Sequence, residues 1–335
     1  MQKLVRSWLW VTIIAILVAQ ANAQNPIKHA FLWSSADGMR DLGSLGGSSY
    51  AYSVNNAGQV VGYYEAPSGD LRAFLWTESA GMQDLGTLGG SSSVAFGINS
   101  QGQVAGWSVT TTGEAHAILW TATTGMQDLG TLGGSFSEGD AINDRGEIAG
   151  SSAKRGNLRV VAYLRTAHGA HSLGTLGSRY SYGYAINAAG TVVGSSPLNQ
   201  NLTPYHAFLR KNRSPITDLG TLGGDNSTAL GINKSEQVVG WATFSGSSSF
   251  NAFLWTQGSG MQYLGSLGGQ NSAAQAINTA GQIVGFSDLS APTATHAVLW
   301  TGPNQIQDLG SRGGDDAVAK GINDVGQVVG WSTLP

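Results

Sequence analysis

The sequence contains no cysteine, only 8 prolines, and few charged residues, which make up 11% of its 335 positions. Without cysteine, disulfides and thiolate metal sites are excluded, so stability must come from packing. No G-x-S-x-G elbow, H-E-x-x-H motif, phosphate-binding loop or calcium-binding loop occurs. The motifs therefore assign no catalytic residue, no metal ligand and no cofactor.

Long apolar runs are also absent except near the N-terminus, where Lys3 and Arg6 precede an apolar run and then Ala21-Asn22-Ala23. This pattern predicts a secretory signal peptide over residues 1–23, cleaved after Ala23, with an apolar run too short to span a bilayer. The mature chain, residues 24–335, would be secreted or periplasmic with no membrane span. Its 15 basic and 20 acidic residues give a net charge of −5, which argues against a nucleic-acid partner.

Glycine is abundant, with 49 residues, and it is arranged in a repeat. A unit of about 45 residues is typical of four-stranded propeller blades. In the unit 91–134, short runs rich in β-branched and aromatic residues predict four strands over 93–99, 103–108, 116–120 and 126–132. We call these strands A, B, C and D in every unit. The phrase L-G-x-x-G marks the repeat, with its first glycine at Gly43, Gly86, Gly130, Gly174, Gly220, Gly265 and Gly310.

The connection between strands A and B has the form Asn-x-x-Gly in six units. It predicts a hairpin built on a type I turn followed by a left-handed residue, which favours glycine. The seventh unit has Asn233 and Glu236, so we expect its hairpin to be built differently or to be strained. The six regular pairs are Asn55 and Gly58, Asn99 and Gly102, Asn143 and Gly146, Asn187 and Gly190, Asn278 and Gly281, and Asn323 and Gly326.

The two ends of the chain carry complementary half-units. Six complete units occupy residues 48–314, whereas residues 29–47 supply only strands C and D and residues 315–335 supply only A and B. Pairing of the two halves would complete a seventh blade and remove the exposed sheet edges of an open array. The sequence therefore predicts one all-β domain over residues 24–335, a seven-bladed β-propeller closed by a split blade.

The phrases HAFLW, GMxDLGTLGG and INxxGQVVGWS together resemble the HAF-type probable extracellular repeat family, and the resemblance covers essentially the whole mature chain. It implies a bacterial, exported protein. It implies no activity and no catalytic residue, because none is assigned to that family.

A basic residue at the start of strand C accompanies an aspartate in strand D of the same unit. Two units lose both members, with Val161 and Ser172 in one and Asn251 and Tyr263 in the other. Coupled loss predicts contact across an antiparallel strand pair, and we interpret the pairs as structural. The five pairs are His29 and Asp41, Arg72 and Asp84, His116 and Asp128, His206 and Asp218, and His296 and Asp308.

The B–C loops vary in length and composition, whereas the A–B turns are nearly uniform, so the face that carries the B–C loops and D–A links is the candidate binding surface. Basic residues are concentrated in one sector, residues 145–213, which is either a patch that binds anions or solvated surface charge. If the sector binds anions, Lys154, Arg155, Arg159 and Arg179 are the predicted binding residues. The predicted function is a binding or structural interaction module whose ligand is an anionic glycan or an envelope protein.

The alternative is an enzyme that acts on polysaccharide through carboxylates near the central channel. The sequence favours the binding module, because the available carboxylates are irregularly placed. They are Glu138, Asp140, Asp225, Asp315 and Asp316.

Overall fold

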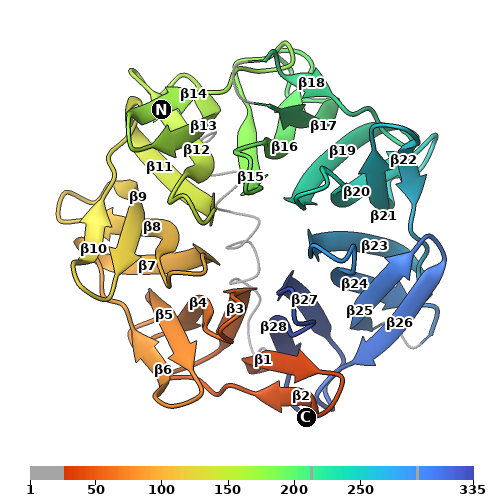
Figure 1. The fold of residues 1–335 in the computed structure, drawn as a ribbon, viewed down its shortest axis with the longest axis horizontal. Helices are drawn as coiled ribbons and strands as arrows, with labels where there is room; N and C mark the ends of the chain where they lie inside the picture. Colours follow the sequence, from red (N-terminus) through yellow and green to blue (C-terminus); the bar gives the residue numbers. More distant parts are fainter. Residues whose placement is uncertain (1–25, 212–213, 292–293) are drawn as a thin grey trace.

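The computed structural model describes residues 26–211, 214–291 and 294–335, and their regular secondary structure consists of 28 strands. Within these ranges there is no helix that could cross a bilayer. The predicted signal peptide, residues 1–23, lies outside the described residues. The strands form five four-stranded sheets and one eight-stranded sheet, arranged around a common centre (Figure 1).

Four of the four-stranded sheets take their strands in chain order. They are β3 (Ser49–Val54), β4 (Val60–Glu65), β5 (Leu71–Thr77) and β6 (Gly81–Asp84); β15 (Tyr182–Ile186), β16 (Val192–Pro197), β17 (Tyr205–Arg210) and β18 (Thr217–Asp218); β19 (Gly223–Ile232), β20 (Val238–Phe244), β21 (Phe250–Thr256) and β22 (Gly260–Tyr263); and β23 (Gly268–Ile277), β24 (Ile283–Leu289), β25 (Thr295–Gly302) and β26 (Gln305–Gly310).

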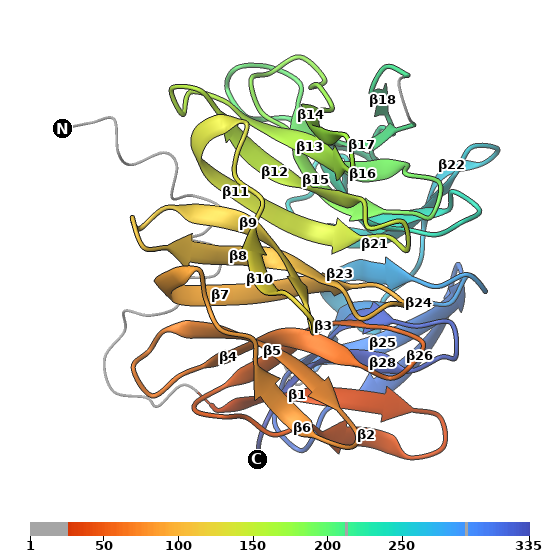
Figure 2. The same ribbon diagram turned by 60° about the vertical axis from the view of Figure 1, so that its left-hand side comes forward.

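The eight-stranded sheet consists of two antiparallel groups of four strands. These groups meet at one parallel residue pair, Phe136 with Ala115. The first group lies below the second in Figure 2. The strands are β7 (Gly89–Ile98), β8 (Val104–Thr110), β9 (Ala115–Thr121), β10 (Gly125–Asp128), β11 (Gly133–Ile142), β12 (Ile148–Lys154), β13 (Val160–Thr166) and β14 (Gly169–Ser172).

The remaining sheet joins the two ends of the chain. Its order is β2 (Gly38–Asp41), β1 (Lys28–Ser34), β28 (Val328–Thr333) and β27 (Ala317–Ile322). β1 pairs with β28 over six residue pairs, from Lys28 with Thr333 to Trp33 with Val328. The predicted pairing of the complementary half-units is therefore present, and in Figure 1 β1 and β2 lie beside β27 and β28 and close the ring of sheets.

Strand bounds differ from the prediction at the link between units. In four units strand A begins at the Gly-Gly pair, as in β7 from Gly89, whereas the sequence placed its start four residues later. Strand D is correspondingly shorter. The reason is contact with strand B: Gly89 pairs with Thr110, and a Cβ on Gly90 would lie 2.5 Å from the carbonyl oxygen of Val109. In these four units the Gly-Gly pair extends the inner strand rather than forming a loop, whereas β3 and β27 begin after their Gly-Gly pairs, at Ser49 and Ala317.

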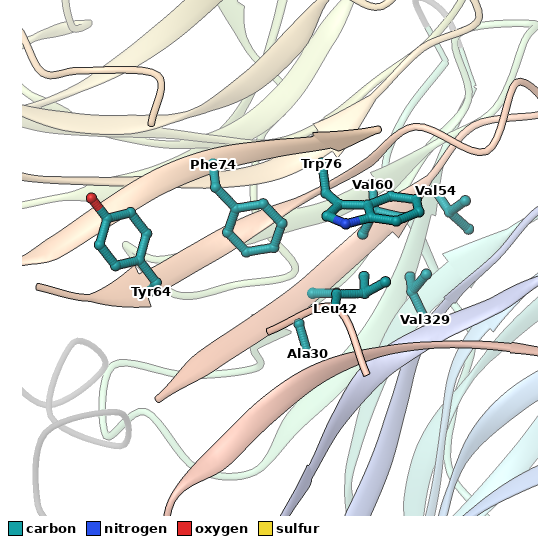
Figure 3. Close-up of a cluster of buried hydrophobic side chains, with 9 residues drawn as sticks. Ala30, Leu42, Val54, Val60, Tyr64, Phe74, Trp76 and Val329 are labelled. Atoms are coloured by element: carbon teal, nitrogen blue, oxygen red, sulfur yellow. The ribbon is translucent and has the colours of Figure 1, made fainter. Parts of the chain in front are cut away.

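The hydrophobic core lies between neighbouring sheets. In one cluster, Ala30 and Val329 from the sheet that joins the chain ends pack against Val60, Phe74 and Trp76 of the next sheet (Figure 3). Equivalent clusters recur around the ring. Removing apolar surface from water contributes about 25 cal/mol per Å², so sheet-to-sheet packing is the main source of stability in this cysteine-free chain.

Each strand B glycine approaches the strand A backbone of its own sheet. A Cβ on Gly106 would lie 2.0 Å from the carbonyl oxygen of Val94, next to a bulge in β7 between Ala95 and Gly97. The close approach is therefore within one sheet, because the bulge tilts the inner strand onto its partner.

The seven A–B turn asparagines form a ring of hydrogen bonds around the molecule. The Nδ2 atom of Asn55 donates to the backbone oxygen of Asn99 at 3.0 Å, and each asparagine repeats this bond with the next unit at 3.0–3.2 Å. The last member, Asn323, donates to Asn55 across 268 positions of sequence. The turn motif predicted the bonds within each hairpin but not these bonds between units.

Asparagine is the residue type that satisfies both sides of this arrangement. In Asn99, Oδ1 accepts from the backbone N–H groups of Gln101 and Gln103, while Nδ2 donates to the Gln103 side chain and to Asn143. All seven side chains are buried. A buried amide with every polar atom paired stabilises the fold, whereas an unpaired one costs free energy.

The irregular hairpin at Asn233 keeps the common geometry. Its backbone bonds match the other turns, and Glu236 takes the left-handed conformation at φ 59° that glycine occupies elsewhere. Of the two alternatives that the sequence predicted, the hairpin has the second: it is built as the others are, with a strained backbone at Glu236. The carboxylate of Glu236 forms an ion pair with Lys211.

We predict that Asn99→Asp lowers the free energy of unfolding by about 2–4 kcal/mol, because the carboxylate keeps the turn bonds but places an acceptor against two buried acceptors. The measurement is urea denaturation. Asn304→Asp is the control, since Asn304 is exposed and outside the ring, and it should change stability by less than about 0.5 kcal/mol. Equal losses in the two variants would contradict a stabilising ring.

Candidate functional site

The five basic–acidic pairs predicted from the sequence are in contact. Nδ1 of His116 lies 2.9 Å from both carboxylate oxygens of Asp128, and Arg72 donates through Nε and Nη2 to Asp84 at 3.1 Å. The other three histidine pairs have distances of 2.8–3.0 Å. Each pair joins strand C to strand D near the rim of the ring.

Each paired aspartate also holds the chain as it leaves strand D. Oδ1 of Asp128 accepts the backbone N–H of Gly130 at 2.7 Å, and the other four aspartates repeat this bond. Burial raises the pKa of Asp41, but hydrogen bonds from His29, the Gly43 N–H and Arg312 outweigh it and hold that pKa below its usual range. These contacts fit the structural role that the sequence suggested.

Two units lack the pair, and their structures differ. In the sheet β19–β22, the large ring of Tyr263 packs against Phe244, with ring centroids 5.5 Å apart. In the group β11–β14, the smaller residues Val161 and Ser172 stand where the others have a basic residue and an aspartate. Here the space left by the missing pair is a pocket of about 340 Å³.

The pocket is lined by side chains from β12, β13 and β14, the link to β15, and the loop between β16 and β17. Three of the four predicted binding residues are present in it, Lys154, Arg159 and Arg179. Arg155 is exposed and is not a lining residue. The other lining residues are Val161, Ser172, Gly174, Thr175, Ser178 and Gln200.

A tight hairpin brings Lys154 and Arg159 together. The backbone N–H of Lys154 donates to the carbonyl oxygen of Arg159 at 2.9 Å, and Asn157 takes a left-handed conformation at φ 57° between them. The Asn157 side chain exchanges two hydrogen bonds of 2.8 Å with Ser135 of β11. The turn is therefore anchored to the inner strand, which positions the two basic residues.

Arg179 comes from a link that differs from the other D–A links. The chain has Gly177-Ser178 where other units have Gly-Gly, and the strand that follows, β15, begins only at Tyr182. The Gln200 amide donates to the carbonyl oxygen of Gly177 at 3.2 Å, so this link lies against the B–C loop between β16 and β17. B–C loops and D–A links thus share a face here, as the sequence predicted.

The positive charge of the pocket has no acidic counterpart among the residues that the structure describes. None of the pocket lining residues is Asp or Glu. Lys154, Arg159 and Arg179 form no ion pair within residues 26–211, 214–291 and 294–335. Because the aspartate of the usual pair is replaced by Ser172, the site has lost the carboxylate that would repel an anion.

The structure brings together only two of the five carboxylates considered for an enzyme. Glu138 and Asp140 lie two residues apart on the inner strand β11. Asp225 and Asp315 are exposed at or before the start of other inner strands. Asp316 accepts the backbone N–H of Thr295 at 3.1 Å and therefore belongs to the contact between two sheets.

Burial sets the protonation of the inner carboxylates. It raises the pKa of Glu138 to about 7. Burial and the Glu138 charge both raise the pKa of Asp140.

Asp140 occupies the bulge of β11, and Lys320 occupies the equivalent bulge of β27. Burial lowers the pKa of Lys320 to about 8, and its amine donates to the Gln275 side chain at 3.1 Å. Sequence reasoning missed Lys320.

No protein-family model and no curated protein sequence matches the chain. Solved structures do. The β-propeller domain of the trilobed protease from Pyrococcus furiosus is 9% identical with a TM-score of 0.55, covering 82% of this chain and 88% of that one. Putative TolB from Agrobacterium tumefaciens is 10% identical with a TM-score of 0.51, covering 93% and 99%. The fold is a β-propeller.

A gluconolactonase from Xanthomonas campestris is also similar, at 13% identity and a TM-score of 0.47, covering 95% of this chain and 99% of that one.

At these identities the likeness concerns the fold alone. The Pyrococcus domain is described as having an open velcro topology. In the present propeller, by contrast, β1 pairs with β28, so the sheet at the junction contains strands from both ends of the chain.

The raised pKa of Glu138 predicts a pH-dependent stability. Between the ordinary glutamate value of 4.5 and about 7, the folded protein binds more protons than the unfolded chain, so the free energy of unfolding should fall as pH rises from 5 to 8. We expect Glu138→Gln to remove about 1–3 kcal/mol of this decline. Urea denaturation of both proteins at four pH values, without added metal ions, measures it. Parallel pH profiles would contradict the shifted pKa.

Proposed function

We propose that this chain is an exported, seven-bladed β-propeller that binds anionic glycans through the pocket lined by Lys154, Arg159 and Arg179. One observation carries the proposal: of the two units that lack the basic–acidic pair, the group β11–β14 has a basic pocket in its place. Ligand pockets of proteins commonly measure about 300–1,000 Å³, and this one is large enough for one charged sugar unit.

The count of seven blades follows if the two halves of the eight-stranded sheet are separate blades. Support comes from the single residue pair that joins the halves and from the seven asparagines of the hydrogen-bonded ring, one for each repeat. We accordingly take residues 24–335 as one domain whose split blade is formed by both chain ends.

Export rests on the signal pattern of residues 1–23 and on the resemblance to HAF-type extracellular repeats. An exported protein meets polysaccharides that carry carboxylate, sulfate or phosphate groups. Guanidinium and ammonium groups form charge-assisted hydrogen bonds with such groups, and each is worth about 1.5–3 kcal/mol. An anionic envelope protein could offer the same groups, and the test below separates the two partners.

The experiment measures binding of the purified protein to anionic and neutral polysaccharides at low and moderate salt. We expect binding to anionic polymers that weakens as salt screens the charges. The combined substitution Lys154→Glu with Arg159→Glu should reduce affinity about tenfold or more. Arg155→Glu is the matched control, because Arg155 neighbours the pocket without lining it, and it should lower affinity less than about threefold.

A second variant tests the origin of the pocket without removing a basic residue. Val161→His with Ser172→Asp introduces the pair found in four other units, so it should fold normally, fill the pocket and abolish binding. Binding that survives in this variant would show that the pocket is not the site. Absence of binding to every polysaccharide, together with pocket-dependent binding to an envelope protein, would replace the glycan with a protein partner.

A further inference from the structure

Exposed apolar side chains are unevenly distributed between the two faces of the ring. All but one of the exposed large hydrophobic residues in the described chain lie at B–C loops, at D–A links or at the strand ends beside them, whereas Val325 lies in an A–B turn. Apolar exposure is therefore concentrated on the face that carries the basic pocket. The residues on that face are Ile27, Leu45, Leu158, Leu202 and Phe244.

Leu158 is the most exposed of these side chains, at 69%, and it lies in the hairpin between β12 and β13. Lys154 and Arg159 close this hairpin through a backbone hydrogen bond of 2.9 Å. The preceding residue, Asn157, is bonded to Ser135 of β11. An anchored turn thus holds the leucine side chain in solvent.

Leu202 is exposed in the next B–C loop, between β16 and β17. It has a φ of 69°, in the left-handed region that is sterically unfavourable for a leucine. Residues held in such conformations are concentrated at functional sites. Gln200 of the same loop lines the basic pocket, as do Lys154 and Arg159 of the Leu158 hairpin, so both loops border that pocket.

The sector around the two leucines has an unbalanced positive charge. Residues 148–217 include eight basic residues and no aspartate or glutamate. Lys211, which follows β17 at the opposite face, is paired with Glu236. The four basic residues on the B–C face form no ion pair within residues 26–211, 214–291 and 294–335. They are Lys154, Arg155, Arg159 and Arg179.

We propose that the docking surface, which consists of Leu158, Leu202 and these four basic residues, binds to a lipid bilayer that contains anionic lipids. Apolar side chains can enter the boundary between headgroups and acyl chains, while lysine and arginine attract anionic headgroups. This docking goes beyond the binding of a glycan, since neither leucine lines the basic pocket.

A bilayer fits the docking surface better than a folded protein does. The two leucines come from separate loops that border a basic pocket, so a rigid partner would need two apolar recesses at matching positions. Acyl chains instead adapt to each side chain where it enters, and anionic lipids can move within the membrane to gather at the four cations.

The two units that precede the docking surface, β3–β6 and β7–β10, have carboxylates on the same face. Glu65 ends β4, Asp70 lies in the loop that follows it, and Glu114 lies in the loop before β9. Anionic headgroups repel these side chains. The molecule should therefore tilt on the membrane, so that β11–β18 contacts the bilayer and the two acidic units do not.

The test measures sedimentation of the purified protein with vesicles. We expect binding to phosphatidylcholine vesicles that contain about 30% phosphatidylglycerol, and little binding to phosphatidylcholine alone. Leu158→Ser with Leu202→Ser should weaken vesicle binding about tenfold or more, because the apolar insertion is lost. Val325→Ser is the matched control, since Val325 is 67% exposed on the opposite face, and it should change binding less than about twofold.

A fluorescent label locates the contact. Because the chain contains no cysteine, one introduced cysteine can be labelled selectively with a dye whose emission depends on polarity. The dye on Leu158→Cys should shift to shorter wavelength when anionic vesicles are added, since this position leaves water. The same dye on Val325→Cys should show no shift.

Three results would overturn the proposal. One is the absence of binding to anionic vesicles, and capture of an anionic protein in its place would assign the surface to a protein partner. Another is equal vesicle binding by the parent and the double leucine variant, which would indicate attraction by charge alone. The third is an unshifted dye at position 158.

Soluble anionic polysaccharide separates this proposal from the proposed function. The double leucine variant should bind it as the parent does, because the basic pocket is intact. Loss of vesicle and polysaccharide binding together in that variant would contradict a separate role for the leucines. Vesicle binding by a parent protein that binds no polysaccharide would support the docking surface and reject the glycan.

Discussion

Each unit of this propeller is tied to the next by an asparagine side chain, and the bond from Asn323 to Asn55 brings the series back to its start. The arrangement depends on both chemical halves of the amide. The oxygen organises the turn of its own unit, while the nitrogen reaches the neighbour. Since the bonds form a closed circle, each one is supported by the position of all units. The pairing of β1 with β28 closes the same ring through the sheet that joins the two chain ends.

A scaffold held by repeated bonds between units can tolerate one unit that departs from the pattern. The group β11–β14 departs from the pattern of the other units in two places, near the outer rim and on its inner strand. Near the rim it has Val161 and Ser172 in place of the ion pair, and basic side chains surround the resulting pocket. On the inner strand it has Glu138 and Asp140 where other units have mainly apolar or aromatic residues. This one unit therefore has basic side chains near the rim and carboxylates on its inner strand, with no ion pair between the two groups among the described residues.

Much of the fold could be predicted because each unit repeats the same local chemistry. The Asn-x-x-Gly turns, the complementary half-units and the coupled basic–acidic pairs are all visible in one chain when its units are compared. Strand bounds at the Gly-Gly pairs were less predictable, since glycine signals a loop locally and its role in strand A depends on contact with strand B. The circle of asparagine bonds was missed because a turn explains the residue without reference to a neighbouring unit.

The candidate site was predictable in part for the same reason. The sequence by itself determined the repeat, the excess of basic residues around Lys154, and the loss of the pair at Val161 and Ser172, because these are properties of residue identity and spacing. Only the tertiary structure decided that these features meet in one pocket, that Arg155 is outside it, and that the Tyr163 hydroxyl is buried. The physical reason is that burial and the distance between side chains depend on how sheets pack, and packing joins residues that the sequence keeps apart.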